Sequence, residues 1–391
     1  MPDSTTTILQ QLLHLLPRND FQSFVGQHKA DRYAKKLKCW NQLTIMLYAQ
    51  ATEKDSLREI ETGLSIQDSR WYHLGLNTVA RSTLGSANGK RPWQIYESLF
   101  YKVLERCQTL GSGTASFSFQ NDLYAIDASV IDLCLTLFPW AGFRKEKGAI
   151  KLHALFNIRS QIPELILITE GKTADIKAIR DIDLSKYAKG SIFVFDKAYT
   201  DYSFFRKIRE AGHHFVIRLK ENSNIVHLGR HKKTSGKGVL ADEKMAFILE
   251  KARKDYPDDL RLITYYDEES DIVYEFLTDH FQLSAVNIAL IYKRRWDVEL
   301  FFKWIKQHLK IKTFLGTSKN AVMIQIWVAM IYYLILAWIK HQTRFKGSLH
   351  TLTVMFKEVF MQPVQIISLL NLTPKTISKA LVRGDPQLSL F

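Results

Sequence analysis

The chain has 391 residues, with 54 Lys and Arg against 39 Asp and Glu, and a net charge of +15 at pH 7. Its three cysteines show no C-x-x-C or Cys/His spacing, which excludes a disulfide framework and a zinc site of the usual kind. The basic excess favours a polyanionic partner, most often nucleic acid, and leaves open a generic basic protein or one that binds anionic lipid.

Residues 1–110 are predicted to form a helical N-terminal domain. Apolar residues recur at helical spacing in CWNQLTIMLYAQ and PWQIYESLFYKVLERC, and the first residues lack the features of a signal peptide. Between those segments Gly63 and Gly85 are expected to break short helices, as in a helix-turn-helix or a small bundle. Three basic residues accompany these helices and favour DNA binding: Arg81, Lys90 and Arg91.

A second domain is expected over residues 111–345, opening on the linker-like segment GSGTASFSFQND. Three strands follow in LYAIDASVIDLCLTLF, AIKLHALFNI and PELILITEG. A helix, the strand SIFVFD, the helix YSFFRKIREAG and the strand HHFVIRLK continue the pattern. The order β-β-β-α-β-α-β predicts an α/β domain, with a mixed sheet flanked by helices. Residues 346–391 are read as a C-terminal extension.

The pattern changes between about residues 221 and 279. The segment GRHKKTSGKG is basic and rich in turn residues, and two strands are expected in LRLITYY and DIVYEFLT. We interpret this stretch as an insertion in the second domain. Ser284 then provides an N-cap for the helix that carries Glu299, where the domain resumes.

Residues 291–310, IYKRRWDVELFFKWIKQHLK, are predicted to form a helix with two different faces. At about 100° per residue, four polar residues fall within an arc of roughly 60°: Tyr292, Arg295, Glu299 and Lys306. The opposite side is apolar and is expected to pack on a core: Val298, Phe301, Ile305 and Leu309. The polar face is either solvated, with Glu299 paired to Arg295 and Lys303, or it lines a cleft.

Residues 321–339, AVMIQIWVAMIYYLILAWI, are apolar over about the length that crosses a bilayer. A fully buried helix in a large core has the same pattern. Gln325 within the segment and the lack of a second such stretch favour the buried helix, and we expect no membrane association.

Two aspartates occupy strand positions. Asp127 lies inside the first strand, and Asp196 closes the fourth; a buried carboxylate is usually paired, protonated or bound to a cation. The alternative for Asp196 is that it caps the following turn. If the first and fourth strands are neighbours, the two aspartates meet, and Glu299 on a packed helix would complete a set of oxygen ligands. Such a set suits Mg²⁺ or Mn²⁺, and two ions about 4 Å apart can activate water and stabilise the leaving oxygen of a phosphodiester.

The helix resembles the YREK signature of bacterial insertion-sequence transposases of the DDE superfamily, in the insertion-sequence-four group. Its four signature residues and all three gaps match: Tyr292, Arg295, Glu299 and Lys306. The segments YAIDASVID and VFDKAYTDY are similar to the family's two aspartate segments. The resemblance covers about residues 30–340 and implies a catalytic and metal-binding triad of Asp127, Asp196 and Glu299.

The resemblance implies an RNase H-like mixed sheet, with a β-rich insertion before the catalytic glutamate. It further implies cut-and-paste transposition in the cytoplasm on the nucleoid, with Mg²⁺ or Mn²⁺, two ions per site, and a homodimer that holds double-stranded transposon ends and target DNA. DNA contacts are expected from Tyr292, Arg295 and Lys306, with Lys303 as a further candidate. Trp296 either stacks on a base or packs against the protein. Two alternatives stay open: a nuclease that does not join DNA, and a non-catalytic DNA-binding protein derived from a transposase.

Overall fold

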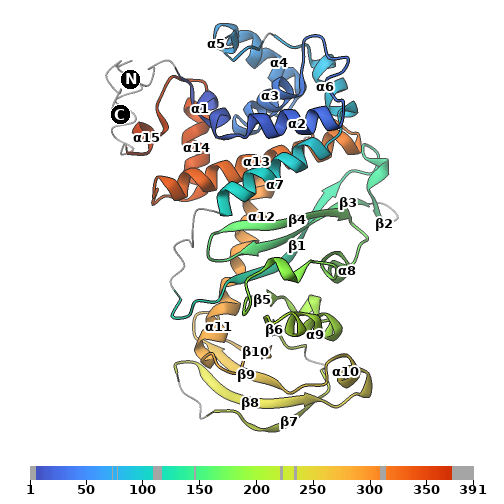
Figure 1. Cartoon of the computed structure of the whole chain (residues 1–391), viewed down its shortest axis with the longest axis vertical. Helices are drawn as coiled ribbons and strands as arrows, with labels where there is room; N and C mark the ends of the chain where they lie inside the picture. Colours follow the sequence, from blue (N-terminus) through green and yellow to red (C-terminus); the bar gives the residue numbers. More distant parts are fainter. Residues whose placement is uncertain are drawn as a thin grey trace. The chain divides into compact units, whose positions relative to one another are not determined.

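The structure is a computed structural model that describes residues 6–72, 74–76, 78–108, 117–144, 147–220, 223–232, 236–308 and 314–371. The chain divides into two compact units (Figure 1). Unit 1 comprises Met1–Gly111, Leu133–Trp140 and Trp304–Phe391, and unit 2 comprises Ser112–Asp132 and Ala141–Lys303. Compactness therefore groups the C-terminal helices with the N-terminal ones, whereas the sequence suggested domains in simple chain order.

Unit 1 is helical in its described residues. Its helices are α1 (Ile8–Leu15), α2 (Arg18–Gln27), α3 (Cys39–Ala51), α4 (Leu57–Ile66), α5 (Asp68–Tyr72), α6 (Arg81–Lys90), α7 (Gln94–Gln108), α13 (Lys319–Gln342), α14 (Leu349–Val359) and α15 (Ile366–Asn371). The long helix α13 packs against α3, α6, α7 and α14. Its Trp327 ring lies 5.2 Å from that of Phe100, between ring centroids.

Helix α13 contains the long apolar segment of the sequence. Ser318 caps it by accepting the backbone N–H of Ala321, and Gln325 inside the core accepts the backbone N–H of Leu315 at 2.9 Å. Within the described residues it is the one helix apolar and long enough to cross a membrane, but 89% of its most apolar window is buried. This burial is typical of a core helix.

The expected helix breaks at Gly63 and Gly85 are wrong. Gly63 lies inside α4 and Gly85 inside α6, and these two helices pack against each other. A Cβ atom on Gly63 would come within 2.4 Å of the Tyr48 hydroxyl, so this glycine permits close packing and does not end a helix.

Unit 2 is a mixed α/β structure built on one large sheet. Its strands are β1 (Leu123–Leu133), β2 (Gly142–Arg144), β3 (Lys147–Asn157), β4 (Ile162–Glu170), β5 (Ile192–Phe195), β6 (His214–Arg218), β7 (Ile225–Arg230), β8 (Val239–Phe247), β9 (Leu260–Asp267) and β10 (Ile272–Thr278). The strand order is β2-β3-β1-β5-β6-β10-β9-β8-β7, with β4 paired to β3. Strands β1, β5 and β6 run parallel to one another. The pairs β6–β10, β10–β9, β9–β8 and β8–β7 are antiparallel.

The predicted insertion continues this sheet. The two expected strands are β9 and β10, and β10 pairs directly with β6. The sequence did not indicate β7, β8 or the short helix α10 (Glu250–Asp255). Strand β7 is largely exposed, and its pairing with β8 shifts register between His227 and Gly229. It therefore lacks the alternation of buried and exposed residues that marks most strands.

Helices cover both faces of the sheet. Helices α8 (Asp175–Ile179), α9 (Tyr202–Glu210) and α10 pack on the face that carries Ile126 and Leu277. Helix α11 (Ala285–Arg294) contacts β6, β8 and β10. Successive strand residues point to opposite faces, and Phe276, next to Leu277, has its ring 4.7 Å from that of Tyr292 in α11. Helix α11 therefore lies on the face opposite α9.

The single helix expected over residues 291–310 is two helices. Helix α11 ends at Arg294, and α12 (Trp296–His308) begins in unit 2 and ends in unit 1. At the junction Arg295 donates its N–H to the Tyr292 carbonyl at 3.0 Å, and Val298 donates to the Arg295 carbonyl at 3.2 Å. These bonds span three residues and tighten the turn. Ser284 caps α11, so it does not cap the helix that carries Glu299.

The apolar side of the predicted helix is buried as expected at Val298, Phe301 and Ile305. The Phe301 ring lies 5.4 Å from the ring of Phe156 in β3. Leu309 and residue 310 lie outside the described residues.

Candidate active site

Strand pairing brings Asp127 and Asp196 together. Strands β1 and β5 are parallel neighbours, with Ile126 opposite Phe195. Asp127 follows Ile126, and Asp196 follows Phe195. The two aspartates therefore lie at the same level of the paired strands. Because Ile126 points to the α9 face, Asp127 points to the face covered by α11. The first and fourth expected strands are thus neighbours, which is the condition for the two aspartates to meet.

The Asp196 side chain does not cap the turn that follows it. Asp196 precedes the short 3-10 helix Lys197–Tyr199, but only its backbone carbonyl bonds there, accepting the Tyr199 N–H at 2.9 Å. Its carboxylate instead accepts the hydroxyl of Tyr292 at 3.5 Å. The capping interpretation of Asp196 therefore has no support in the structure.

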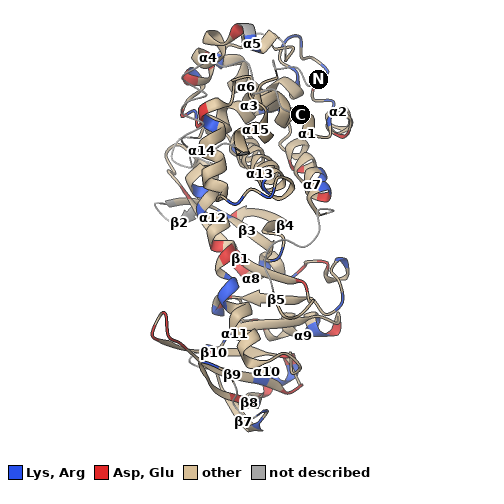
Figure 2. Ribbon diagram, turned by 90° about the vertical axis from the view of Figure 1, so that its left-hand side faces the viewer, with Lys and Arg blue, Asp and Glu red and all other residues tan. Residues whose placement is uncertain are grey.

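Arg295 joins the first aspartate to the glutamate. Its Nη1 lies 3.3 Å from Asp127 Oδ2, and its Nη2 lies 2.8 Å from Glu299 Oε1. The Arg295 side chain is 7% exposed, so the pair with Glu299 is not part of a solvated helix face. Basic and acidic residues meet where α11 joins α12 (Figure 2). Two neighbouring turns of helix thus contact all three acids, through Arg295 and Tyr292.

Electrostatics supports a shared acidic site. The pKa of Asp127 is raised from 3.8 to about 6, chiefly by burial and also by the charges of Glu299 and Asp196, against the opposing effects of the Ala128 N–H and Arg295. The Ala128 N–H donates to Asp127 Oδ1 at 2.8 Å. The charges that raise the pKa of Asp127 come from acids that lie near it.

Tyr292 and Tyr199 bring neutral hydroxyls to the same region. Burial raises the pKa of Tyr292 to about 12, so its hydroxyl keeps its proton and can donate to Asp196. The Tyr199 hydroxyl is buried and has no hydrogen-bond partner in the described part of the chain. Burial raises the pKa of Tyr199 most, and the charges of Asp127 and Asp196 raise it further. The sequence interpretation missed Tyr199, although it lies three residues after Asp196 in the segment VFDKAYTDY.

The donor set fits a hard divalent cation in its chemistry, because it consists of carboxylate oxygens. As they stand, no three His, Cys, Asp or Glu side chains of the described residues are arranged to hold a metal ion. The contacts give the reason, since the Arg295 guanidinium lies between Asp127 and Glu299. In this arrangement Asp127 and Glu299 are paired with Arg295 and not with an ion.

The remaining predicted DNA contacts lie outside this cluster. Lys303 is exposed, and among the described residues it forms no ion pair with Glu299. Trp296 is 57% exposed, with the Arg295 guanidinium 5.7 Å from its ring centroid, so it is not a core residue. Lys306 is exposed on α12, in the part of the helix that belongs to unit 1.

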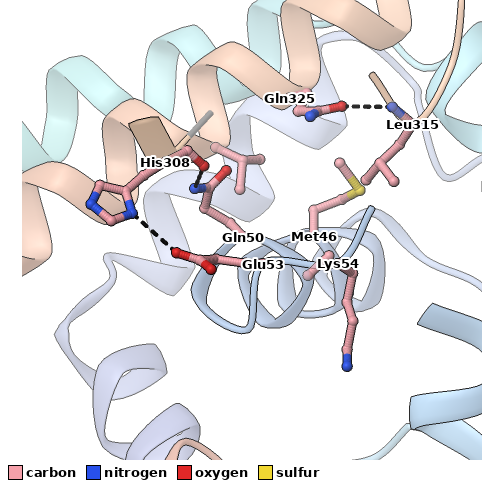
Figure 3. A pocket seen from close by; sticks show the side chains of 9 residues that line it. Met46, Gln50, Glu53, Lys54, His308, Leu315 and Gln325 are labelled. Carbon is pink, nitrogen blue, oxygen red and sulfur yellow. Dashed lines mark hydrogen bonds and ion pairs between the residues drawn. The ribbon is translucent and has the colours of Figure 1, made fainter. Parts of the chain in front are cut away.

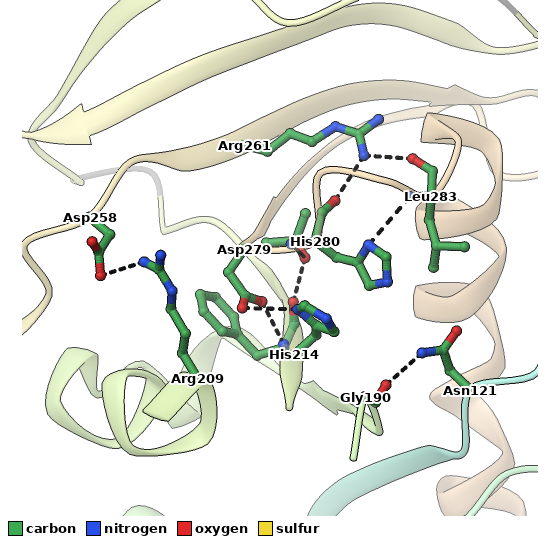
Figure 4. Close-up of polar contacts among 11 residues, drawn as sticks. Asn121, Gly190, Arg209, His214, Asp258, Arg261, Asp279, His280 and Leu283 are labelled. Carbon is green, nitrogen blue, oxygen red and sulfur yellow. Dashed lines mark hydrogen bonds and ion pairs between the residues drawn. The ribbon is translucent and has the colours of Figure 1, made fainter. Parts of the chain in front are cut away.

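A second polar cluster in unit 2 is structural (Figure 4). Asp279 lies 3.1 Å from His214 Nδ1 and accepts the Phe215 backbone N–H at 2.9 Å. His213 lies 3.0 Å from the Leu184 carbonyl through its Nε2. Burial lowers the pKa of His280 to about 4, so this imidazole is neutral. These contacts are internal to unit 2, and they identify His213 and His214 as structural residues.

Unit 1 contains a small pocket near the end of α12 (Figure 3). Its polar groups are paired with one another: Gln50 donates to the His308 carbonyl at 2.6 Å, and His308 Nδ1 lies 3.3 Å from Glu53. Lys357 donates to the same Glu53 at 2.5 Å. The polar groups named here contact each other, and we assign no chemistry to this pocket.

Comparison with known proteins assigns a family to the part of the chain that contains the three acids. Residues 118–335 match the transposase DDE domain, and residues 4–77 match a domain of unknown function, DUF4372. The chain is 34% identical to transposase y4zB of Sinorhizobium fredii over 259 residues, which are 65% of this chain and 69% of the relative. It is 27% identical to a transposase for insertion sequence element IS5377 of Geobacillus stearothermophilus, over 69% of this chain and 70% of the relative.

A solved structure, the piggyBac transposase synaptic complex with hairpin DNA, aligns with a TM-score of 0.43 and 8% identity over 97% of this chain and 84% of that chain. The DDE domain match spans more than half of the chain and includes Asp127, Asp196 and Glu299. The chain belongs to the bacterial insertion-sequence transposases of the DDE type.

Proposed function

We propose that this transposase cleaves DNA at the ends of its element and joins the freed 3′ ends to target DNA, by cut-and-paste. The observation that carries the proposal is the convergence of Asp127, Asp196 and Glu299 on Arg295 and Tyr292. The interior of β1, the end of β5 and helix α12 supply the acids, and the cation and the phenol beside them are suitable phosphate-binding groups.

Asp127, Asp196 and Glu299 would hold the divalent ions, Mg²⁺ or Mn²⁺, with two ions in each site. When bound, such ions supply an activated water or hydroxyl and stabilise the leaving oxygen of the phosphodiester. The contacts described for Asp127, Asp196 and Glu299 include no thiol or imidazole that would compete with the carboxylate oxygens for a metal ion. This donor set favours hard cations over zinc.

Arg295 would exchange its carboxylate partners for a DNA phosphate. In the structure it neutralises Asp127 and Glu299, which lowers the repulsion between these two partly buried acids. A phosphate of the cleaved strand is an anion, like the two carboxylates. It can accept two hydrogen bonds from the same planar guanidinium. Tyr292 would donate to a phosphate oxygen beside it, while Lys303, Lys306 and Trp296 would contact the DNA further along α12.

The strand order supports an RNase H-like catalytic domain. Strands β4, β3, β1, β5 and β6 lie in that order, with β3 and β4 antiparallel and with β1, β5 and β6 parallel. We further propose that residues 1–110 act as a helical N-terminal domain and that a homodimer holds two double-stranded ends in the synaptic complex. We expect the protein to act in the cytoplasm, on the nucleoid.

The test uses DNA that carries an end of the element, with purified full-length protein. Replacing Asp127, Asp196 or Glu299 with alanine is expected to abolish Mg²⁺-dependent nicking and to spare DNA binding. Asp132→Ala is the matched control, because Asp132 lies on the same strand as Asp127 and is exposed. Nicking that survives all three substitutions would remove these acids from the mechanism.

A strand-transfer assay with a labelled end separates the alternatives. Joined product is expected from the unaltered protein. Cleavage without joining would identify a nuclease, and binding without cleavage in either Mg²⁺ or Mn²⁺ would identify a non-catalytic DNA-binding protein.

A further inference from the structure

We propose that the loop between α2 and α3, residues 28–38, is a DNA phosphate-binding surface, and that it gives the N-terminal region of unknown function a DNA-contacting role. The loop, HKADRYAKKLK, is called the basic loop below. It lies within residues 4–77, the region that matches a domain of unknown function. The proposal rests on the proposed DNA transposase function and adds a second contact surface, in unit 1.

The basic loop carries five cations that point to solvent. They are all exposed: Lys29, Arg32, Lys35, Lys36 and Lys38. Among the residues that the structure describes, none of the five forms an ion pair with an acid. A cluster of cations without acidic partners repels itself, and a polyanion relieves that repulsion.

The one acid of the loop is turned inward. Asp31 accepts the backbone N–H of Cys39 at 2.8 Å and lies 3.5 Å from Arg91 Nη2. Its charge therefore compensates a buried arginine and leaves the five outward cations uncompensated. The sequence interpretation had assigned Arg91 to a DNA-binding helix pair, but Arg91 is only 8% exposed and is committed to this internal network.

The same network holds the loop in one conformation. Arg91 donates to the Leu37 carbonyl and, at 2.8 Å, to Gln42. Gln42 in turn donates to Asn88 at 2.6 Å, so the loop is anchored to α3 and α6. A surface that is already ordered loses less conformational entropy when a ligand binds. The basic loop is therefore better suited to binding than a mobile basic tail.

Tyr33 is the second feature that points to a partner. Its side chain is 85% exposed, and the Arg32 guanidinium lies 5.4 Å from its ring centroid. Tyrosine usually buries most of its ring in a monomer, and exposed Tyr and Arg side by side are enriched in binding surfaces. On duplex DNA, Arg32 would bind a phosphate while the Tyr33 ring packs against the sugar backbone.

Duplex DNA is the occupant that the charge favours, because the chain is a transposase and its other proposed contacts are to duplex DNA. The test is the salt dependence of binding to a short fluorescent duplex, measured by anisotropy. The triple variant R32A/K35A/K36A is expected to reduce the slope of log K against log salt by about 2–3, since each phosphate contact contributes about 0.9. Affinity at moderate salt is expected to fall at least tenfold.

The matched control is K251A/R253A/K254A on α10, which removes three exposed cations from unit 2. Its slope and affinity are expected to equal those of the unaltered protein. The charge-preserving variant R32K/K35R/K36R is also expected to bind like the unaltered protein, and Tyr33→Ala is expected to weaken binding more than Tyr33→Phe. Equal slopes for the R32A/K35A/K36A variant and the unaltered protein would overturn the proposal.

Two further arms identify the source of any failure. If the unaltered protein binds no duplex at all, the proposed transposase function fails as well. If it binds duplex and the triple alanine variant binds equally, only the inference about the basic loop fails. The unaltered protein and the R32A/K35A/K36A variant are expected to bind vesicles of phosphatidylcholine and phosphatidylglycerol equally. If the variant loses vesicle binding but keeps duplex binding, the partner of the basic loop is a membrane and not DNA.

Discussion

Two buried arginines of unit 2 face carboxylates in different ways. Arg261 is fully buried and makes a two-pronged contact with Asp242, with both nitrogen–oxygen distances at 2.8 Å. Its remaining Nη1 donates to the carbonyls of His280 and Leu283 at 2.9 and 2.6 Å (Figure 4). Arg295 divides its guanidinium between Asp127 and Glu299, and its buried Nε has no partner in the described part of the chain.

The difference separates a structural ion pair from one that we propose to be functional. Nearly all the N–H donors of Arg261 are bonded to the Asp242 carboxylate and to backbone carbonyls of the same unit. Arg261 therefore stabilises one conformation of the insertion strands. Arg295 has one long contact and one unused donor, and it faces more carboxylate charge than it can neutralise. Incomplete satisfaction of buried polar groups is typical of sites that bind something else.

The largest effect is expected from breaking the structural pair. Arg261→Leu leaves Asp242 buried without its cation, which should lower the free energy of unfolding by about 3–5 kcal/mol. Thermal and urea unfolding would measure the change. The double variant R261M/D242L removes both charges and is expected to recover most of the loss. If Arg261→Leu unfolds like the unaltered protein, the distinction between the two arginines is wrong.

The next effect concerns the acid that Arg295 contacts. Asp127→Asn should reduce cleavage more than about a hundredfold, because changes even behind a metal ligand cost about 10–100-fold. Its effect on stability should have the opposite sign from that of Arg261→Leu. The carboxyl that burial disfavours is replaced by a neutral amide, so the variant should melt at a higher temperature in EDTA at neutral pH.

The pH dependence follows from the direction of the Asp127 shift. Its pKa is raised from 3.8 to about 6, so the folded chain binds this proton more tightly than the unfolded chain does. The Asp127 contribution to stability is therefore favourable below about pH 4 and is lost as pH rises to about 6. Melting curves of Asp127→Asn and the unaltered protein should diverge over that range. Parallel curves would contradict the raised pKa.

Much of the fold follows from local pattern. Alternation and β-branched residues located β1, β3 and β4, and the apolar run SIFVF located β5, so the two aspartates were placed on the correct strands. Strand β7 escaped because it is largely exposed and shows no clear alternation. The grouping of α13 with the N-terminal helices depends on packing between segments far apart in the chain, which periodicity does not record.

The site was harder to predict than the strands. Helical spacing placed Arg295 and Glu299 as partners, but the same spacing describes a solvated pair, and only tertiary burial distinguishes the two. The break between α11 and α12 has no glycine or proline to announce it. The break occurs at Arg295, whose side chain contacts Asp127 on the sheet. That contact joins residues far apart in the sequence, so the local pattern does not reveal it.

Replacing Arg295 tests whether its guanidinium competes with metal ions for the carboxylates. Arg295→Gln removes a charge-assisted contact from each of two carboxylates, and one such contact is worth about 1.5–3 kcal/mol. The affinity for Mn²⁺ without DNA, measured by calorimetry, should therefore rise about tenfold or more. Arg294→Gln is the control, because the neighbouring Arg294 pairs with Asp297 at 2.8 Å. Equal Mn²⁺ affinities for Arg295→Gln and the unaltered protein would show that Arg295 does not hold the acids apart.

The smallest effect is expected at Tyr292, whose bond to Asp196 is long at 3.5 Å. Tyr292→Phe should change stability by less than about 0.5 kcal/mol, since a bond of that length contributes little. Cleavage should fall about threefold, because the hydroxyl is expected to contact the DNA phosphate more closely than it contacts Asp196. Tyr266→Phe removes a 2.9 Å bond to Asp271 on an exposed turn and should leave cleavage unchanged. If Tyr292→Phe lowers stability but not cleavage, Tyr292 belongs with Arg261 among the structural residues.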